Sequence, residues 1–260
     1  MCACEIKWLK RTGKSEEERM DILNTNKKLW IDTRLNEEEM DFLWSACSAE
    51  DRKDHSNSLA GNIFKSELIK DKDNWFYETT LKGLTERMYY DEWDNYRKYI
   101  LNEDEEKPKF KMFSLWVNYQ RQYEFNPIHD HTGLYSFVIF MKIPTHWKEQ
   151  IALPISVNSN TPLASHFQFI LGKENGEVMT FPIAHSPEDE GRMLFFPAWL
   201  KHMVYPFYEC EEERITISGN IDFNLEKKEN ADEEEENMTK ILEKHMESMK
   251  KDMNLLEKRG

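Results

Sequence analysis

The sequence has few of the features that mark secreted or membrane proteins. It contains only four cysteines in 260 residues, and they are scattered along the chain, unlike a disulfide framework. No stretch approaches the roughly 18 apolar residues of a membrane span. The first residues lack the basic and apolar regions of a signal peptide. We therefore expect no membrane span and a cytoplasmic location, or the host cytoplasm if the protein is viral.

Basic residues are also scarce relative to acidic ones. The chain has 35 Lys and Arg against 49 Asp and Glu, a net charge of −14. Nucleic-acid backbones reward clustered Lys and Arg, so this balance argues against nucleic acid as a partner. A small-molecule or peptide substrate agrees better with it. The hydrophobic content of 39% and aromatic content of 13% are typical of a folded protein with a sizeable core.

The residue patterns divide the chain into three regions. Residues 1–105 are predicted to form a helical N-terminal extension that packs on the core, because apolar residues recur there at helical spacing. One such helix would begin at Asn36, which forms a capping-box pattern with Glu39. Residues 106–224 are predicted to form the core, mainly of strands. Residues 225–260 are predicted to be an acidic hinge and an amphipathic C-terminal helix.

Apolar residues in the C-terminal region recur at heptad spacing, at Leu242, Met246, Met249, Met253 and Leu256. The pattern covers only about two heptads. Two interpretations stay open: a single amphipathic helix, or a short self-association helix that would make the protein a homo-oligomer.

The strands of the central region alternate between polar and apolar residues. Segments 112–121 and 213–223 show this most clearly, and several shorter strands lie between them, separated by turn residues. The pattern predicts a mainly β fold, a sandwich or a barrel. A polar face is ordinarily turned to solvent. For Asn118 and Arg214 we favour a polar lining inside the barrel, because nearby histidines need a polar cavity.

Three histidines form the most informative pattern. His129 and His131 are two residues apart, and side chains two apart on an extended strand point the same way. His202 follows an apolar strand that ends in a proline turn. Neutral imidazoles bind iron, zinc, copper or nickel. Three ligands that close one face of a metal leave other positions open, as a catalytic metal requires.

The residues around these positions resemble a known enzyme family. The resemblance lies in segments 116–119, 126–133, 136–138, 196–207 and 213–220, together with Gly191, within a match of roughly 112–223. They are similar to the iron(II)- and 2-oxoglutarate-dependent dioxygenases, most of all to a group from phages and bacteria related to the prolyl hydroxylases. The resemblance implies a double-stranded β-helix (jelly-roll) core that uses Fe(II), 2-oxoglutarate and O₂. It implies hydroxylation of an unidentified substrate with release of succinate and CO₂.

The resemblance also implies roles for particular residues. His129 and His202 would be metal ligands, and Arg214 would bind the distal carboxylate of 2-oxoglutarate with help from Thr216 and Asn118. The family's usual third ligand is a carboxylate two residues after the first histidine. Here that position is His131. Strand geometry favours a three-histidine face. A bend of the chain at Thr132 and Gly133 would instead bring in Asp130 as the third ligand.

Two other functions stay open at this point. One is a three-histidine, cupin-like metalloenzyme that does not use 2-oxoglutarate. The other is a non-catalytic binding module with a degenerate metal site. Arg214 distinguishes the first of these, because a cupin would not need a guanidinium on the strand after the last ligand.

Overall fold

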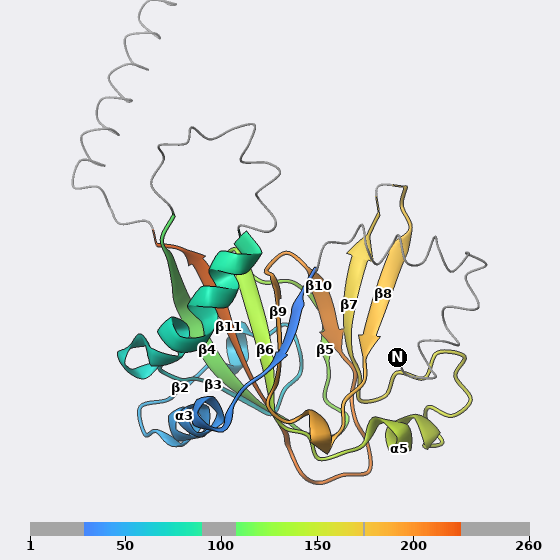
Figure 1. Ribbon diagram of the computed structural model, residues 1–260. Coiled ribbons are helices and arrows are strands. Elements are labelled where there is room, and N and C mark those ends of the chain that lie inside the picture. Colours follow the sequence, from blue (N-terminus) through green and yellow to red (C-terminus); the bar gives the residue numbers. More distant parts are fainter. Residues whose placement is uncertain (1–28, 90–107, 174, 225–260) are drawn as a thin grey trace, which may run out of the picture. The chain divides into compact units, whose positions relative to one another are not determined.

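The computed structural model describes residues 29–89, 108–173 and 175–224. Within them the fold is mainly β, with two antiparallel sheets and a few helices (Figure 1). The two sheets are consistent with a double-stranded β-helix. The C-terminal helix that the sequence predicts, and with it the proposed self-association, lies outside the described residues.

The larger sheet has seven strands in the order β1-β9-β6-β11-β4-β3-β2. Their bounds are β1 Ile31–Arg34, β9 Arg192–Pro197, β6 Tyr135–Lys142, β11 Arg214–Phe223, β4 Phe110–Gln120, β3 Lys65–Leu68 and β2 Lys53–Asp54. The smaller sheet has four strands in the order β5-β10-β7-β8. Their bounds are β5 Asn126–His129, β10 Lys201–Val204, β7 Phe167–Gly172 and β8 Val178–Ile183.

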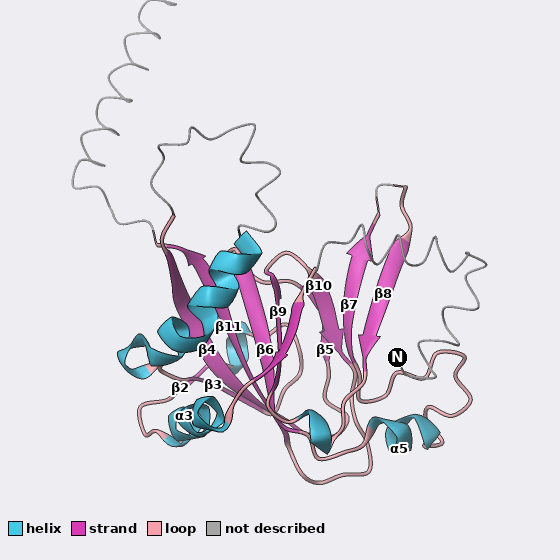
Figure 2. Ribbon diagram, viewed as in Figure 1, coloured by secondary structure: helices cyan, strands magenta, loops and turns pink. Residues whose placement is uncertain are grey.

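Helices cover the outer face of the larger sheet (Figure 2). Helix α3, Glu37–Ser48, begins at the predicted cap: the Asn36 side chain accepts from the Glu39 amide, and the Glu39 side chain accepts from the Asn36 amide. A second helical stretch, 75–89, contains a π turn at Tyr77–Leu81. Leu43 and Leu81 from these helices are fully buried in one apolar cluster with Ile217 of β11. The described helices also include the short α5, Trp147–Ala152.

The predicted helical character of residues 1–105 needs a correction. The described part of this region also contributes three short strands, β1, β2 and β3, to the larger sheet. β1 pairs with β9, and β3 pairs with β4. Strands of two to four residues are too short to show alternation, and their pairing with longer strands decides their conformation. Residues 1–28 and 90–105 lie outside the described residues.

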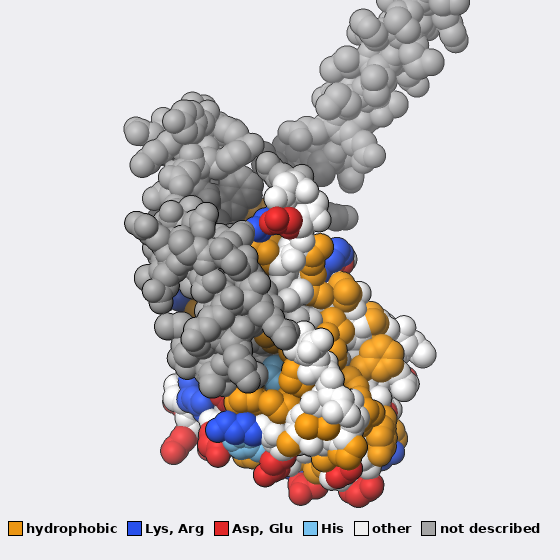
Figure 3. Space-filling model, turned by 90° about the vertical axis from the view of Figure 1, so that its right-hand side faces the viewer, with side chains coloured by type: hydrophobic (Ala, Val, Ile, Leu, Met, Phe, Trp, Pro, Cys, Tyr) orange, Lys and Arg blue, Asp and Glu red, His pale blue; other side chains and the backbone are white. Residues whose placement is uncertain are grey.

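A second apolar cluster lies between the sheets. It joins Phe140 of β6 and Phe196 of β9 to Phe167 and Phe169 of β7, all almost fully buried. On the side that carries β7, β8 and α5, many apolar side chains reach the surface (Figure 3). No helix in the described ranges is long and apolar enough to cross a bilayer.

Candidate metal centre

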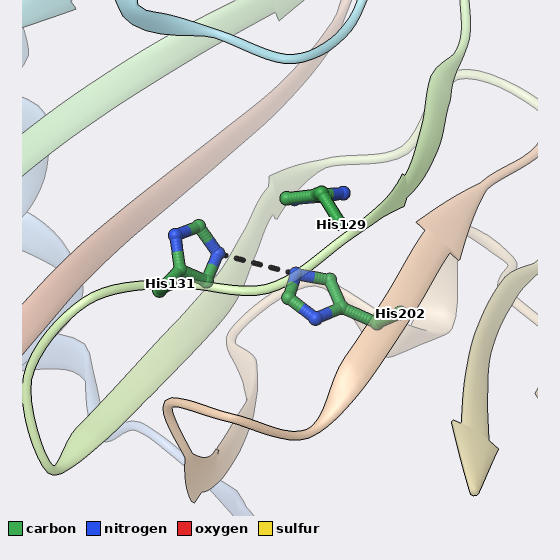
Figure 4. A group of neighbouring side chains, drawn as sticks. All are labelled: His129, His131 and His202. Atoms are coloured by element: carbon green, nitrogen blue, oxygen red, sulfur yellow. Dashed lines mark hydrogen bonds between the residues drawn. The ribbon is translucent and has the colours of Figure 1, made fainter. Parts of the chain in front are cut away.

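The three histidines that the sequence predicts as ligands lie together between the sheets (Figure 4). His129 ends β5 and lies opposite His202 of β10 in the antiparallel register. His131 lies just beyond β5, and its backbone N–H donates to the Ala198 carbonyl at 2.9 Å. One ring nitrogen of each histidine lies within 4.8 Å of those of the other two. In the described chain this is the one group of three such side chains that could hold a metal ion.

His131 reaches the cluster from a different element than the sequence predicts. His129 and His131 were expected to share one face of an extended strand. The strand ends at His129, and His131 enters the cluster from the following loop. The loop is held by its backbone contact with Ala198, which follows β9. The cluster therefore depends on a long-range contact as well as on strand alternation.

Hydrogen bonds fix two of the imidazole rings in the form that binds metals. The Nδ1 of His129 lies 2.7 Å from the Pro127 carbonyl, and the Nδ1 of His202 lies 2.9 Å from the Leu200 carbonyl. A carbonyl only accepts, so each Nδ1 carries the proton and each Nε2 keeps its lone pair. The Nε2 atoms of His131 and His202 are 3.2 Å apart. A bound metal would displace the Asn126 amide, which lies 3.3 Å from the Nε2 of His129.

All three imidazoles are neutral at neutral pH. Burial is the main cause that lowers the pKa of each ring, and it lowers that of His131 to about 4. Protonation of His129 would lower the pKa of both its neighbours further, because like charges repel. Neutral imidazole is the protonation state that coordinates a metal. The site is therefore ready to bind a divalent cation without first releasing protons from these rings.

Asp130, the alternative third ligand, lies outside this group. Its carboxylate is half exposed and lies 2.6 Å from the Nζ of Lys201. Lys201 precedes His202 on β10, so this ion pair joins the two ligand-bearing segments at the surface. The geometry brings His131 to the other two histidines and directs the Asp130 carboxylate to Lys201.

A cavity of about 410 Å³ contains the histidine cluster. The polar faces of β4 and β11 form one wall, as the alternation of these segments predicts for an inward polar face. This wall comprises Ser114, Trp116, Asn118, Gln120, Arg214, Thr216, Ser218 and Asn220. The loop between β2 and β3 adds Leu59 and Ile63, which were not among the site residues predicted from the sequence.

Arg214 is a buried cation with neutral partners at one end of this cavity. It is 1% exposed. Its Nη2 donates to the Ser165 hydroxyl at 2.5 Å and to the Ser165 carbonyl at 3.1 Å, and its Nη1 donates to the Gln120 Oε1 at 3.4 Å. Its Nε has no hydrogen-bond partner. Burial lowers the pKa of Arg214 to about 10, so the guanidinium stays charged at neutral pH.

Thr216 and Asn118 lie beside Arg214 in the sheet. They are direct partners in the antiparallel register of β11 and β4, next to the Arg214–Gln120 pair. Gln120 could have been found from the sequence, because it shares the polar face of 112–121 with Asn118. Ser165 could not, since it lies 49 residues from Arg214 and has a positive φ of 68° in a loop.

Comparison with known proteins identifies the class of this domain. Residues 114–220 match the family model described as "Putative 2OG-Fe(II) oxygenase". A search of the curated proteins found no match. The three histidines and the buried Arg214 all lie within the matched residues. Residues 114–220 thus carry the pattern of the 2OG-Fe(II) oxygenase family, whose members use Fe(II) and 2-oxoglutarate.

Solved structures with a similar arrangement include three bacterial enzymes. A prolyl-4-hydroxylase from Pseudomonas putida is 11% identical, with a TM-score of 0.43 over 77% of this chain and 96% of that one. A 2OG-Fe(II) oxygenase family oxidoreductase from Burkholderia pseudomallei is 7% identical, with a TM-score of 0.45 over 81% and 92%. HygX from Streptomyces hygroscopicus, solved with nickel, 2-oxoglutarate and hygromycin B, is 8% identical, with a TM-score of 0.44 over 81% and 88%.

Proposed function

We propose that the protein is an Fe(II)- and 2-oxoglutarate-dependent dioxygenase that hydroxylates a small molecule or a peptidyl residue and releases succinate and CO₂. One observation carries the proposal: a fully buried guanidinium without a carboxylate partner shares a cavity with three imidazoles whose geometry suits a metal. A buried charge is costly unless it is paired, so such an arginine calls for an anionic ligand.

The residues present fit the two groups that the family uses. His129, His131 and His202 would hold the iron through their Nε2 atoms and leave the remaining positions for other ligands. Bound iron would supply the activation of O₂ that hydroxylation needs. Three neutral ligands leave more positive charge on the metal than two histidines and a carboxylate, so the site should attract an anionic co-substrate strongly.

Arg214 would bind the distal carboxylate of 2-oxoglutarate. A guanidinium matches a carboxylate with paired N–H donors, and the Nε of Arg214 is a buried donor without a partner. The Thr216 hydroxyl and the Asn118 amide lie on the same wall between Arg214 and the histidines. They would donate to the co-substrate or accept from its surroundings, and so fix its orientation. The protein would thereby exclude water from the co-substrate's charged end.

The proposal is tested by succinate release from 2-oxoglutarate with Fe(II) and O₂. The wild-type chain should produce succinate slowly even without a substrate, and Arg214→Ala should lose this turnover. Arg121→Ala is a matched control, because Arg121 is half exposed and pairs with Glu213 at the surface. Normal turnover by Arg214→Ala would refute the assignment of the anchor. Failure of the iron-loaded wild-type protein to bind 2-oxoglutarate would favour the cupin-like enzyme instead.

A further inference from the structure

The cavity continues past the histidines on the side away from Arg214. The ring of Trp116, on β4, lies 5.7 Å from that of His131, so Trp116 marks the level of the cluster along the strand. Arg214 pairs with Gln120, four residues away in one direction. At about 3.3 Å per residue this is roughly 13 Å along the strand. The co-substrate proposed above would occupy this side.

In the other direction, two residues from Trp116, Ser114 of β4 pairs with Asn220 of β11. Both residues line the cavity. This pair lies roughly 7 Å from the level of Trp116 along the strand. It is therefore on the opposite side of the histidine cluster from the co-substrate anchor, within reach of a molecule that also approaches the metal.

Both side chains have buried polar atoms without partners. Asn220 is 7% exposed, and neither its Oδ1 nor the Ser114 Oγ makes a hydrogen bond. Buried polar atoms in folded proteins nearly always have a partner, so an unsatisfied pair that faces a cavity indicates a ligand group. An asparagine amide and a serine hydroxyl together offer donors and acceptors. A hydroxyl or an amide satisfies both.

An apolar surface lies beside this pair. The register of β4 and β11 shifts between Asn220 and Ile221, so Phe113 is the extra residue of a β-bulge. A bulge redirects a side chain, and the Phe113 ring borders the cavity with 46% of the residue exposed. A Cβ on Gly133 would lie 2.9 Å from this ring, so the glycine leaves space for it. The ring offers a flat apolar face to a ligand.

The charge of the cavity restricts what this pair can bind. Among the described residues that line it, Arg214 is the one Lys or Arg and Asp130 is the one acidic residue. Arg214 is at the other end, and Asp130 is paired with Lys201. No described lining side chain would therefore supply a counter-charge to a carboxylate or an ammonium group beside Asn220, and such a group would lose hydration without compensation from these side chains. A neutral group would not.

We propose that Ser114 and Asn220 form the substrate subsite of this enzyme, and that it binds a neutral hydroxyl or amide group whose apolar neighbour packs on Phe113. The inference rests on the proposed function, because that function assigns the opposite end of the cavity to 2-oxoglutarate. It makes Ser114 and Asn220 the residues that determine substrate specificity.

Four cyclohexyl compounds that differ in one group test this subsite: cyclohexanol, cyclohexanecarboxamide, cyclohexanecarboxylate and cyclohexylammonium. Their binding to the full-length protein is measured by ligand-observed NMR, first without added metal and then with Zn(II) and 2-oxoglutarate. The alcohol and the carboxamide should bind at least tenfold more tightly than the two ions. Ser114→Ala should weaken the binding of both neutral compounds roughly fivefold, since it removes one hydrogen bond.

A pair of matched variants locates the effect. Asn220→Leu should weaken the binding of the neutral compounds more than tenfold and leave 2-oxoglutarate binding intact. Asn118→Leu makes the same change at the co-substrate end, so it should do the reverse. The proposal is overturned if the wild-type protein does not discriminate among the four compounds, or if Asn220→Leu and Ser114→Ala leave this discrimination unchanged.

The outcomes also separate this proposal from the function on which it rests. If 2-oxoglutarate fails to bind while the protein still selects the neutral compounds through Asn220, the proposed function fails and the subsite stands. If 2-oxoglutarate binds and the selection is absent, only the subsite fails. Should Asn220→Leu not fold, as shown by loss of 2-oxoglutarate binding and of its circular dichroism, Ser114→Ala decides the question alone.

Discussion

Replacing Arg214 with methionine should stabilise the protein without ligand and remove its response to 2-oxoglutarate. The guanidinium is fully buried, and its partners Ser165 and Gln120 are neutral. Methionine has a similar length and needs no hydration. Replacement of a buried charge by an apolar group of similar size often increases the free energy of unfolding. Arg214 would lower the free energy of unfolding of the ligand-free protein because the carboxylate that balances its charge would come from the ligand.

The size of the effect follows from the burial of the charge. Burial lowers the pKa of Arg214 from 12.5 to about 10. At about 1.4 kcal/mol per pH unit, this is a cost of about 3 kcal/mol for the charged form. The hydrogen bonds to Ser165 and Gln120 offset part of it, and their loss should cost about 1–2 kcal/mol. Arg214→Met should therefore raise the free energy of unfolding by about 1–2 kcal/mol.

Urea denaturation of the Zn(II)-loaded protein, with and without 2-oxoglutarate, measures both effects. At a ligand concentration one hundred times the dissociation constant, 2-oxoglutarate should stabilise the wild-type protein by about 2.7 kcal/mol. It should not stabilise Arg214→Met. The two proteins should thus exchange rank when the ligand is added. If Arg214→Met is less stable than wild type without ligand and still responds to 2-oxoglutarate, the arginine has a structural role and the reasoning is wrong.

Three further predictions concern stability. His185 is fully buried with no partner for either ring nitrogen, and burial lowers its pKa well below 6.5. The unfolded chain therefore binds a proton that the folded chain excludes, and stability falls as the pH drops below about 6.5, by about 1.4 kcal/mol per pH unit. His185→Phe should remove that contribution from the pH dependence of the unfolding free energy, and an unchanged slope would contradict its neutral burial. Gly133→Ala should cost about 1–3 kcal/mol in denaturation experiments, because φ is +97° and the Cβ would lie 2.8 Å from the Ile221 carbonyl oxygen. Gly176→Ala, with φ +82° and open space, should cost less, and equal losses would argue against the close contact. Asn36→Ala should lower the free energy of unfolding by about 1 kcal/mol, because it removes the α3 cap. Asn36→Asp should retain the cap and the wild-type stability. An Asn36→Ala variant as stable as the wild type would show that the cap does not stabilise the protein.

Patterns within a strand predicted much of the fold and the histidine group. The polar and apolar faces of β4 and β11 follow from alternation, and the predicted segments 112–121 and 213–223 agree with these strands to within two residues. His129 and His202 meet because β5 and β10 pair. The capping box at Asn36 is local and was also predictable.

Contacts between distant segments were not predictable in the same way. Ser165 reaches Arg214 from a loop, and a single sequence carries no signal for that pairing. The bulge at Phe113 depends on the register of two strands, which alternation does not specify. The short strands β1 and β3 form because longer strands offer them an edge. The choice between His131 and Asp130 depends on the path of one loop, which is held by the contact with Ala198.

The most direct test of the account is an anaerobic titration of the protein with Fe(II) and 2-oxoglutarate, followed by visible absorption. A keto acid bound through both its keto and carboxylate oxygens to Fe(II) gives a charge-transfer band, so the wild-type protein should develop one. Asp130→Ala should keep the band, since the Asp130 carboxylate contacts Lys201, and His131→Ala and Arg214→Met should lose it at the same concentrations. A protein that binds Fe(II) but shows no band would contradict the binding of 2-oxoglutarate at the metal. A band that survives loss of His131 and disappears with loss of Asp130 would contradict the three-histidine site proposed here.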